Sequence, residues 1–305
     1  MGSLAGIGRC AGSAKLSNDL VQRGVIETIL EESPMLRVMP FLDVEGNSFK
    51  YNQESALGGA SFYAVNGVWS EGTATFTQKT VNLAILGGDA DVDNFVQRAR
   101  SNVNDQRAIQ TVLKAKDVAR KWESTVLYGD SSADPNAFDG LSTLITTTGS
   151  SAQVLTPAAG GGALTLALVD QLIDLVRGGK PDCLLTTRKQ RRKLKALLMA
   201  SAHYVESGES AFGRQVMHYD GIPVLVSDFL TDTEAADNGT GSTFSSMWAL
   251  HFSPADGLTG LTNGGIEALD IGPLETKDAS RVRIRWYVGQ ALLRDSAVGR
   301  LRGLN

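Results

Sequence analysis

The longest periodic segment of the chain is a helix predicted over residues 105–128. Apolar residues recur there at three-and-four spacing with charged residues between them, as on a helix with one buried face. This stripe comprises Ala108, Val112, Ala115, Ala119, Trp122 and Val126. Asp105 is a suitable N-cap, and Gly129 is a suitable C-terminal stop. At 1.5 Å per residue the helix would be about 36 Å long, a long strut for a chain of this size.

A long hairpin is predicted over residues 46–80. The segments "NSFKYNQES" and "TATFTQKTVNLAIL" are rich in Thr, Val, Phe and Tyr and alternate in part, which favours two strands. A two-stranded hairpin is marginal alone in water, and such a thin element can hide few aromatic side chains. We therefore expect this segment to lie on another subunit. The predicted interface residues are Phe62, Tyr63, Trp69 and Phe76.

The remaining segments complete a mixed pattern. Residues 1–45 resemble an arm with a weakly amphipathic helix, in which Val21, Val25 and Ile29 share one stripe. Residues 89–128 are predicted to be helical throughout, as a short helix followed by the long one. Helical and strand patterns alternate from about 160 to 255, which indicates an α/β subdomain. Apolar residues alternate with arginines in "SRVRIRWYVGQALLR", which predicts a half-buried strand that returns near the long helix.

Composition excludes several classes of protein. A net charge of -4 and a pI near 5.5 give no general attraction to nucleic acids or acidic membranes. Cys10 and Cys183 are far apart, so neither a disulfide framework nor a zinc ribbon is indicated. We find no run of 18 apolar residues and no secretory signal pattern, so we expect no membrane partner.

Glycine-rich motifs give no cofactor site. "GIGRCAG" has dinucleotide-fingerprint spacing, but only five residues precede Gly6, too few for the strand that this fold requires. The glycine run at 160–162 leads into a helix but lacks the Gly-Lys-Ser/Thr ending of a phosphate loop. No metal-binding motif occurs. We therefore assign no catalytic, cofactor-binding or metal-binding residues.

Two alternatives from other classes stay open. Ser210 in "GESAFG", with His203 and His218 nearby, could form the site of an α/β hydrolase. Its glycine spacing is one residue too long for a nucleophile elbow, and no apolar strand leads into it. The cluster "RKQRRKLK", residues 188–195, could bind nucleic acid, although on a helix its charges spread over most of the circumference.

The segment that ends the long helix resembles a known family. Leu127-Tyr128-Gly129-Asp130, a short loop with Pro135, and then Phe138-Asp139-Gly140-Leu141 resemble the exit of the spine helix in major capsid proteins of tailed bacteriophages. These proteins have the Hong Kong 97-type fold. The resemblance continues in order through "SPMLRVMPF", "GNSFKYNQES", "KPDCLLTTRKQRRKLKAL", "GIPVLVSD" and "VRIRWYVGQALL". It therefore extends over most of the chain.

The resemblance implies an α+β fold with four parts. These are an N-terminal arm (1–45), an extended hairpin loop (46–80), a peripheral domain (81–160 and 256–305) carrying the spine helix (105–128), and an α/β axial domain (161–255). The loop from Gly129 to Gly140 is then a corner rather than a site. The residues expected to pack the spine helix and the corner are Trp122, Gly129, Phe138 and Gly140.

The resemblance also implies a function. The chain would be a structural protein without enzymatic activity that assembles with itself, through hexamers and pentamers, into an icosahedral shell. The shell would enclose phage DNA without sequence-specific binding. Separate scaffold and portal proteins are expected, with the chain in the virion capsid and, during assembly, in the host cytoplasm. No lysine lies between Tyr51 and Gln78, so we expect no covalent cross-links through the loop. The alternative is an encapsulin-like nanocompartment shell, which has the same fold and encloses protein cargo.

Overall fold

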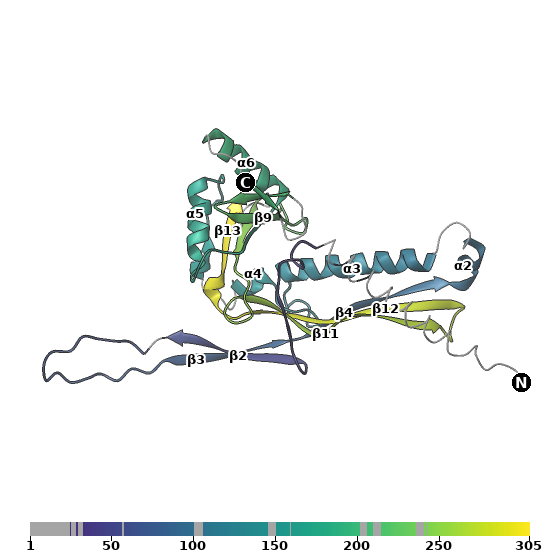
Figure 1. The fold of residues 1–305 in the computed structure, drawn as a ribbon, viewed down its shortest axis with the longest axis horizontal. Helices are drawn as coiled ribbons and strands as arrows, with labels where there is room; N and C mark the ends of the chain where they lie inside the picture. The colour runs from purple at the N-terminus through teal and green to yellow at the C-terminus, as the bar shows by residue number, and fades with distance from the viewer. Residues whose placement is uncertain are drawn as a thin grey trace, which may run out of the picture.

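The computed structural model describes residues 33–56, 58–100, 106–145, 151–158, 160–201, 206–209, 215–235, 241 and 243–305, together with Val25 and Ile29. These residues form a long four-stranded sheet, a smaller lobe on a seven-stranded sheet, and a separate two-stranded hairpin. Figure 1 shows a long helix lying along the four-stranded sheet, with the lobe rising near one end of this helix. The hairpin extends beyond that same end, so the molecule is elongated.

The four-stranded sheet has the order β1-β11-β12-β4. Its strands are β1 (Phe41–Asp43), β4 (Ala84–Asp93), β11 (Leu258–Pro273) and β12 (Ala279–Leu292). β12 pairs antiparallel with both β11 and β4, and β1 pairs parallel with β11. The alternation predicted in residues 280–294 is confirmed in β12, where Val282, Ile284, Trp286 and Val288 are buried.

The predicted long helix is confirmed as α3 (Gln106–Tyr128), which packs on β4 and β12. Ala115 and Ala119 are fully buried and let the helix approach the sheet closely. The expected stripe differs at its N-terminal end, where Thr111 is buried and Val112 is 40% exposed. Neighbouring helical residues lie about 100° apart around the axis, so Val112 falls on the flank of the buried face.

The helix expected from residue 89 is wrong for residues 89–93, which belong to β4. Asp89 and Asp91 lie on one face of this strand, opposite Arg283 and Arg281 of β12. The Arg281 Nε–Asp91 Oδ1 distance is 2.6 Å and the Arg283 Nε–Asp89 Oδ1 distance is 2.7 Å. These cross-strand ion pairs favour a strand where the local run of charge had indicated a helix. The short helix α2 (Asn94–Arg100) begins only after Asp93.

The lobe is built on a sheet with the order β5-β13-β10-β6-β9-β8-β7. Its strands are β5 (Val154–Leu155), β6 (Cys183–Thr186), β7 (Glu206–Glu209), β8 (Gln215–Tyr219), β9 (Ile222–Val226), β10 (Ser245–Leu250) and β13 (Val298–Leu304). The expected alternation is confirmed in α5 (Leu166–Leu175), β6, α6 (Arg188–Ala200) and β9, and β6 runs parallel to β9. Thr165 and Thr187 cap the two helices through their side-chain oxygens.

The end of the chain leaves the long sheet. We expected residues 256–305 to stay together, but β13 pairs with β10 and β5 in the lobe. The physical reason is burial, since Val298, Leu301 and Leu304 are fully buried beside β10. The short helices η3 (Asp295–Ala297) and η2 (Ser151–Gln153) precede β13 and β5 respectively. In the predicted N-terminal arm, Val25 and Ile29 are helical and buried, while Val21 lies outside the described residues.

Candidate assembly interface

The hairpin is firmly anchored at its base. β2 (Ser48–Ala56) and β3 (Thr75–Asn82) pair antiparallel from Ser48↔Asn82 to Ala56↔Thr75. The Tyr51 hydroxyl donates a 2.8 Å hydrogen bond to the carbonyl oxygen of Leu292. Burial, with the nearby Asp295 carboxylate, raises the pKa of Tyr51 to about 12. Lys79 Nζ lies 3.4 Å from Asp295 Oδ1, so both strands are tied to the body.

The far part of the hairpin, residues 58–74, contains no strand. Gly58 and Gly72 face each other where this part begins, and a Cβ atom on either residue would overlap the backbone of the other. Their lack of side chains therefore lets the two arms meet in a narrow neck. A turn at the end is closed by a 2.9 Å hydrogen bond from Gly67 N to Ala64 O, with Asn66 at a φ of 67°.

Beyond the neck, the tip holds itself together through one aromatic pair. The rings of Tyr63 and Trp69 stack with centroids 4.5 Å apart. The Tyr63 hydroxyl lies 2.8 Å from Ser70 Oγ and accepts a 3.1 Å hydrogen bond from Ser70 N. The side-chain hydrogen bond with Ser70 also lowers the pKa of Tyr63. Tyr63 therefore shapes the tip in addition to its predicted interface role.

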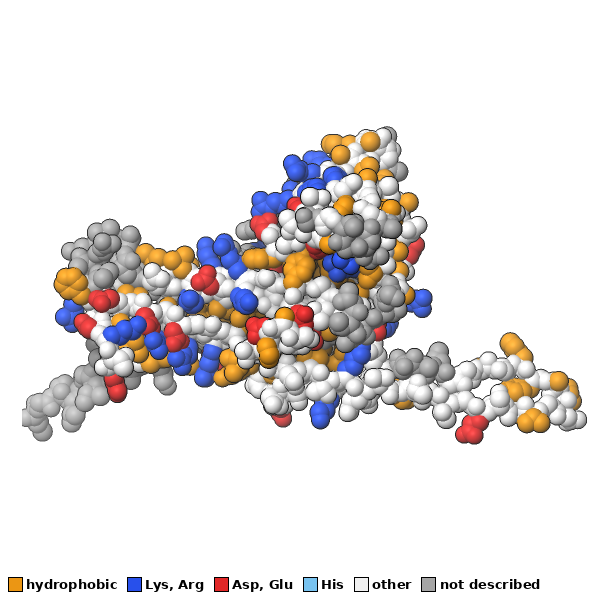
Figure 2. Space-filling model, turned by 180° about the vertical axis from the view of Figure 1, so that it is seen from behind, with side chains coloured by type: hydrophobic (Ala, Val, Ile, Leu, Met, Phe, Trp, Pro, Cys, Tyr) orange, Lys and Arg blue, Asp and Glu red, His pale blue; other side chains and the backbone are white. Residues whose placement is uncertain are grey.

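Four large apolar side chains at the tip are uncovered, and we call them the hairpin-tip patch. Its members are Phe62 (108% exposed), Val65 (96%), Val68 (93%) and Trp69 (78%). Figure 2 shows hydrophobic side chains gathered at this end of the hairpin. Phe76, on β3, is also exposed (67%) but lies outside the tip. Sequence reasoning named the aromatic residues and missed the two valines, which adjoin the Asn66-Gly67 turn.

The corner after α3 is packed tightly. The N–H of Gly140 donates a 2.9 Å hydrogen bond to Gly129 O. A Cβ atom on Gly140 would come within 2.5 Å of Gly129 N and of Thr125 O, so the close approach requires glycine. Phe138 is buried in the core beside α3. Three of the four residues predicted for packing of the spine helix and the corner thus lie together at the corner.

The fourth predicted residue, Trp122, lies one to two turns earlier in α3 and is 1% exposed. Its ring stacks on Trp286 of β12, with centroids 5.9 Å apart, and lies 6.0 Å from the Phe41 ring of β1. This aromatic cluster joins the helix to the centre and the edge of the long sheet. In Figure 1 the hairpin extends away from α3 and from the long sheet.

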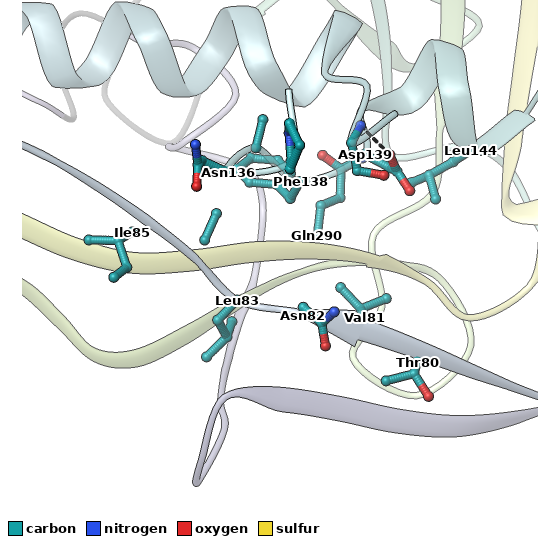
Figure 3. A pocket seen from close by; sticks show the side chains of 14 residues that line it. Thr80, Val81, Asn82, Leu83, Ile85, Asn136, Phe138, Asp139, Leu144 and Gln290 are labelled. Carbon is teal, nitrogen blue, oxygen red and sulfur yellow. Dashed lines mark hydrogen bonds between the residues drawn. The ribbon is translucent and has the colours of Figure 1, made fainter. Parts of the chain in front are cut away.

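A groove of about 540 Å³ separates the corner loop from the base of the hairpin. Its lower wall is formed by Leu83, which links β3 to β4, and by Ile85 at the start of β4. Its upper wall is the loop with Asn136 and Phe138 (Figure 3). Gln290 of β12 lies between the two walls. Sequence reasoning did not predict this groove. The available signal was the single amide in the apolar run "VGQALL".

The described residues do not assemble a hydrolase site around Ser210 or a nucleic-acid site at residues 188–195. Ser210 and His203 lie outside the described residues, and the ring Nδ1 of His218 lies 2.9 Å from the Val216 carbonyl oxygen. In the basic cluster, Arg188 forms a two-point ion pair with Asp228. Arg191, Arg192 and Lys195 are exposed on α6.

The described part of the chain contains neither a metal-binding cluster nor a membrane-spanning helix. No group of three or more His, Cys, Asp or Glu side chains there could hold a metal ion. Among the same residues, no helix combines the length and apolar character needed to cross a bilayer.

Comparison with known proteins identifies both fold and family. A family model described as SU10 major capsid protein matches residues 66–239, more than half of the chain. No curated protein matches the chain. The holo-SrpI encapsulin complex from Synechococcus elongatus PCC 7942 is similar in structure, with a TM-score of 0.69 and 18% identity over 90% of this chain and 89% of that one.

Two further solved structures have the same fold. The capsid of a native GTA particle gives a TM-score of 0.63 at 15% identity over 90% of this chain and 91% of that one. A chain of Microbacterium phage Oxtober96 gives 0.63 at 13% identity over 88% and 90%. The predicted α+β fold of the Hong Kong 97 type is confirmed.

Proposed function

The chain belongs to the SU10 major capsid protein family, and we propose that its copies form hexameric and pentameric rings that close into an icosahedral shell around phage DNA. Its role is structural and capsid-forming. The observation that carries the proposed assembly is the hairpin-tip patch, which places four uncovered apolar side chains on an element without a core. Exposed apolar patches that one chain cannot bury mark sites of protein association.

In this assembly the hairpin of one copy lies across its neighbour. Burial of apolar side chains contributes roughly 25 cal/mol per Å² removed from water, so covering the tip favours association. Phe62 and Trp69 supply the largest areas, while Phe76 extends the contact along β3. Tyr63 keeps the tip in one shape, which lowers the entropy lost on binding.

The corner would set the geometry of the ring. Trp122, Gly129, Phe138 and Gly140 hold α3 against the long sheet and fix where the lobe departs from it. We assign residues 81–145 and 256–297 to a peripheral domain and residues 151–255, which include β5 of the lobe sheet, to an axial domain around the ring axis. β13 joins the axial part, and residues 46–80 form the extended loop between copies.

The charge of the chain suits a container. With a net charge of -4, the wall has little general affinity for phosphates and would enclose DNA without sequence-specific binding. This assembly needs neither catalysis nor a cofactor, because packing alone forms the shell. Separate scaffold and portal proteins would act with it, in the host cytoplasm, before the chain resides in the virion.

A nanocompartment that encloses protein is the second candidate, and the structural similarity to the SrpI encapsulin favours it. The two candidates differ in the contents of the particle. Nuclease-protected DNA in purified shells supports the phage capsid. Shells that contain a co-purifying protein and no DNA support the nanocompartment.

The assembly itself is tested by deleting residues 56–72. We expect a folded subunit that forms no shells, measured by negative-stain electron microscopy and by light-scattering mass in the same buffer. Glu71→Gln, a change at the tip outside the patch, is the matched control and should assemble normally. Intact shells from the deletion variant would contradict the role of the hairpin.

A further inference from the structure

The groove between the corner loop and the hairpin base exists because β4 stops pairing early. The β12–β4 ladder ends at Val288↔Ala84, and the chain then turns away through Leu83, whose N–H donates to Asn47 O at 2.9 Å. β12 continues to Leu292, so Gln290 lies beyond the end of its neighbour on this side. The side chain of Gln290 rises from β12 toward the corner loop, into the groove (Figure 3).

Gln290 carries an unmet requirement for hydrogen bonds. The residue is 1% exposed, and neither Nε2 nor Oε1 of its amide has a hydrogen-bond partner among the described residues. A buried amide without partners costs free energy, so a ligand that supplies both a donor and an acceptor would relieve this cost. A peptide group in an extended chain offers both, through its N–H and its carbonyl oxygen.

The walls of the groove also present apolar surface. Ile85, at its edge, is 76% exposed although it is a large aliphatic residue at the start of a strand. Leu83 and Phe138 form the apolar part of the lining, while Asn136 and Asp139 add polar groups. The groove therefore suits an extended segment that has both an apolar side chain and free backbone groups.

The hairpin tip of a second copy has both properties. Residues 58–74 contain no strand, so their backbone lacks a ladder of strand hydrogen bonds, and the hairpin-tip patch is uncovered. In one copy the hairpin extends away from the long sheet and the lobe of that copy (Figure 1). Tip and groove are different surfaces of the same chain, and a contact between them is head-to-tail, the kind that generates rings or open filaments.

We propose that the groove of one copy binds the hairpin tip of the next, with the Gln290 amide hydrogen-bonded to a peptide group of the tip and Ile85 packed against its apolar side chains. This inference rests on the proposed assembly and names the receptor surface for the hairpin. The hydrogen bonds of the Gln290 amide are then unmade in the single subunit and formed in the shell.

Disulfide trapping tests the contact. In a Cys10→Ser background, Trp69→Cys places a thiol at the tip and Asn136→Cys places one at the groove. Cys183 is buried, and burial raises the pKa of its thiol, so it does not compete. Assembled particles of the double variant should form disulfide-linked multimers on mild oxidation. Each single variant should not.

A second pair of cysteine substitutions distinguishes a specific tip-to-groove contact from disulfides formed by random collision. Trp69→Cys combined with Met199→Cys, an exposed position on α6, should give few links in the same particles. Shells without tip-to-groove links would overturn the inference and leave the proposed assembly intact. If neither the unsubstituted chain nor the Cys10→Ser parent forms any shell, both the tip-to-groove inference and the proposed assembly are overturned.

The Gln290 amide is tested with Gln290→Met, which keeps the length of the side chain and removes the amide. The unassembled subunit should melt at the same or a higher temperature, because an unsatisfied buried group is lost. The protein concentration needed for assembly should rise roughly two- to tenfold, as expected for one net hydrogen bond. Gln78→Met, on the exposed face of β3, is the matched control. An unchanged assembly threshold in Gln290→Met would overturn the role of the amide.

Discussion

The core between α3 and the long sheet and the hairpin tip each contain a tryptophan in an aromatic stack, yet the two regions are built in opposite ways. Trp122 is 1% exposed and lies against Trp286 and Phe41, inside a continuous core. Trp69 is 78% exposed and, among the described residues, stacks only on Tyr63. The residue type is the same in both places. The two tryptophans differ in what packs against them, because the long sheet covers Trp122 and leaves Trp69 uncovered. The proposed assembly surface therefore differs from the core in that no second layer of the same chain covers it among the described residues.

Trp122→Ala should have the largest effect on folding. It removes a fully buried ring from between α3 and the long sheet, and we expect the free energy of unfolding to fall by about 3–5 kcal/mol. Denaturant unfolding of unassembled subunits measures this loss. Trp69→Ala is the matched change at the tip and should alter the same quantity by less than about 0.5 kcal/mol. Similar losses in both variants would remove the contrast between the two regions.

Gly140→Ala should have the next largest effect. The added methyl group would meet the backbone of Gly129 and Thr125, and overpacking of this kind costs about 1–3 kcal/mol. Thermal unfolding of the subunit should show a clear decrease in the midpoint. Gly160→Ala is the control, because no atom lies within 4 Å of a Cβ atom built there. A neutral Gly140→Ala would indicate that the corner can relax.

The ion pairs of the long sheet should add a smaller, pH-dependent contribution. Hydrogen bonds from Arg283 and Arg281 lower the pKa of Asp89 and Asp91 below their ordinary value of 3.8. A lowered pKa in the folded state stabilises the fold above pH 3.8, and this stabilisation is lost as the pH falls through the folded-state values. Melting temperatures between pH 2 and 6 should therefore fall less steeply in Asp91→Asn than in the parent.

The smallest effect on folding is expected for Phe62→Ser combined with Val68→Ser. Both side chains are uncovered in the subunit, so its unfolding free energy should change by less than about 0.5 kcal/mol. Assembly should nevertheless be lost, because the hairpin-tip patch would be polar. Sedimentation of the variant beside Glu71→Gln distinguishes the outcomes. Normal shells would show that the tip contributes little to association.

Much of the fold could be predicted because local patterns and tertiary packing agree. The three-and-four spacing up to Val126 indicates α3, and the alternation from Val282 to Val288 indicates β12. The strand at Asp89–Asp93 was missed because its ion-pair partners lie in β12, about 190 residues away in sequence. Nothing local distinguishes a charged strand of this kind from the start of a helix.

The hairpin aromatics could be predicted as exposed because a two-stranded ribbon cannot bury them. The groove could not, because it depends on where the β12–β4 ladder ends and on how the corner loop lies above it. The valines of the tip were missed for a similar reason. Val65 and Val68 become prominent only when the Asn66-Gly67 turn points them outward.

The path of β13 has a consequence for the order of events during synthesis. The chain leaves the lobe after β10, forms β11 and β12, and returns to pair Val298–Leu304 with β10. Until those residues have emerged from the ribosome, β10 has an open edge and the lobe lacks a strand from the interior of its sheet. Formation of the long sheet is delayed as well, because the partner of β4 in this sheet is the late strand β12. A nascent chain therefore completes neither sheet before β12 and β13 have been synthesised, and the proposed assembly surfaces become correctly placed only then.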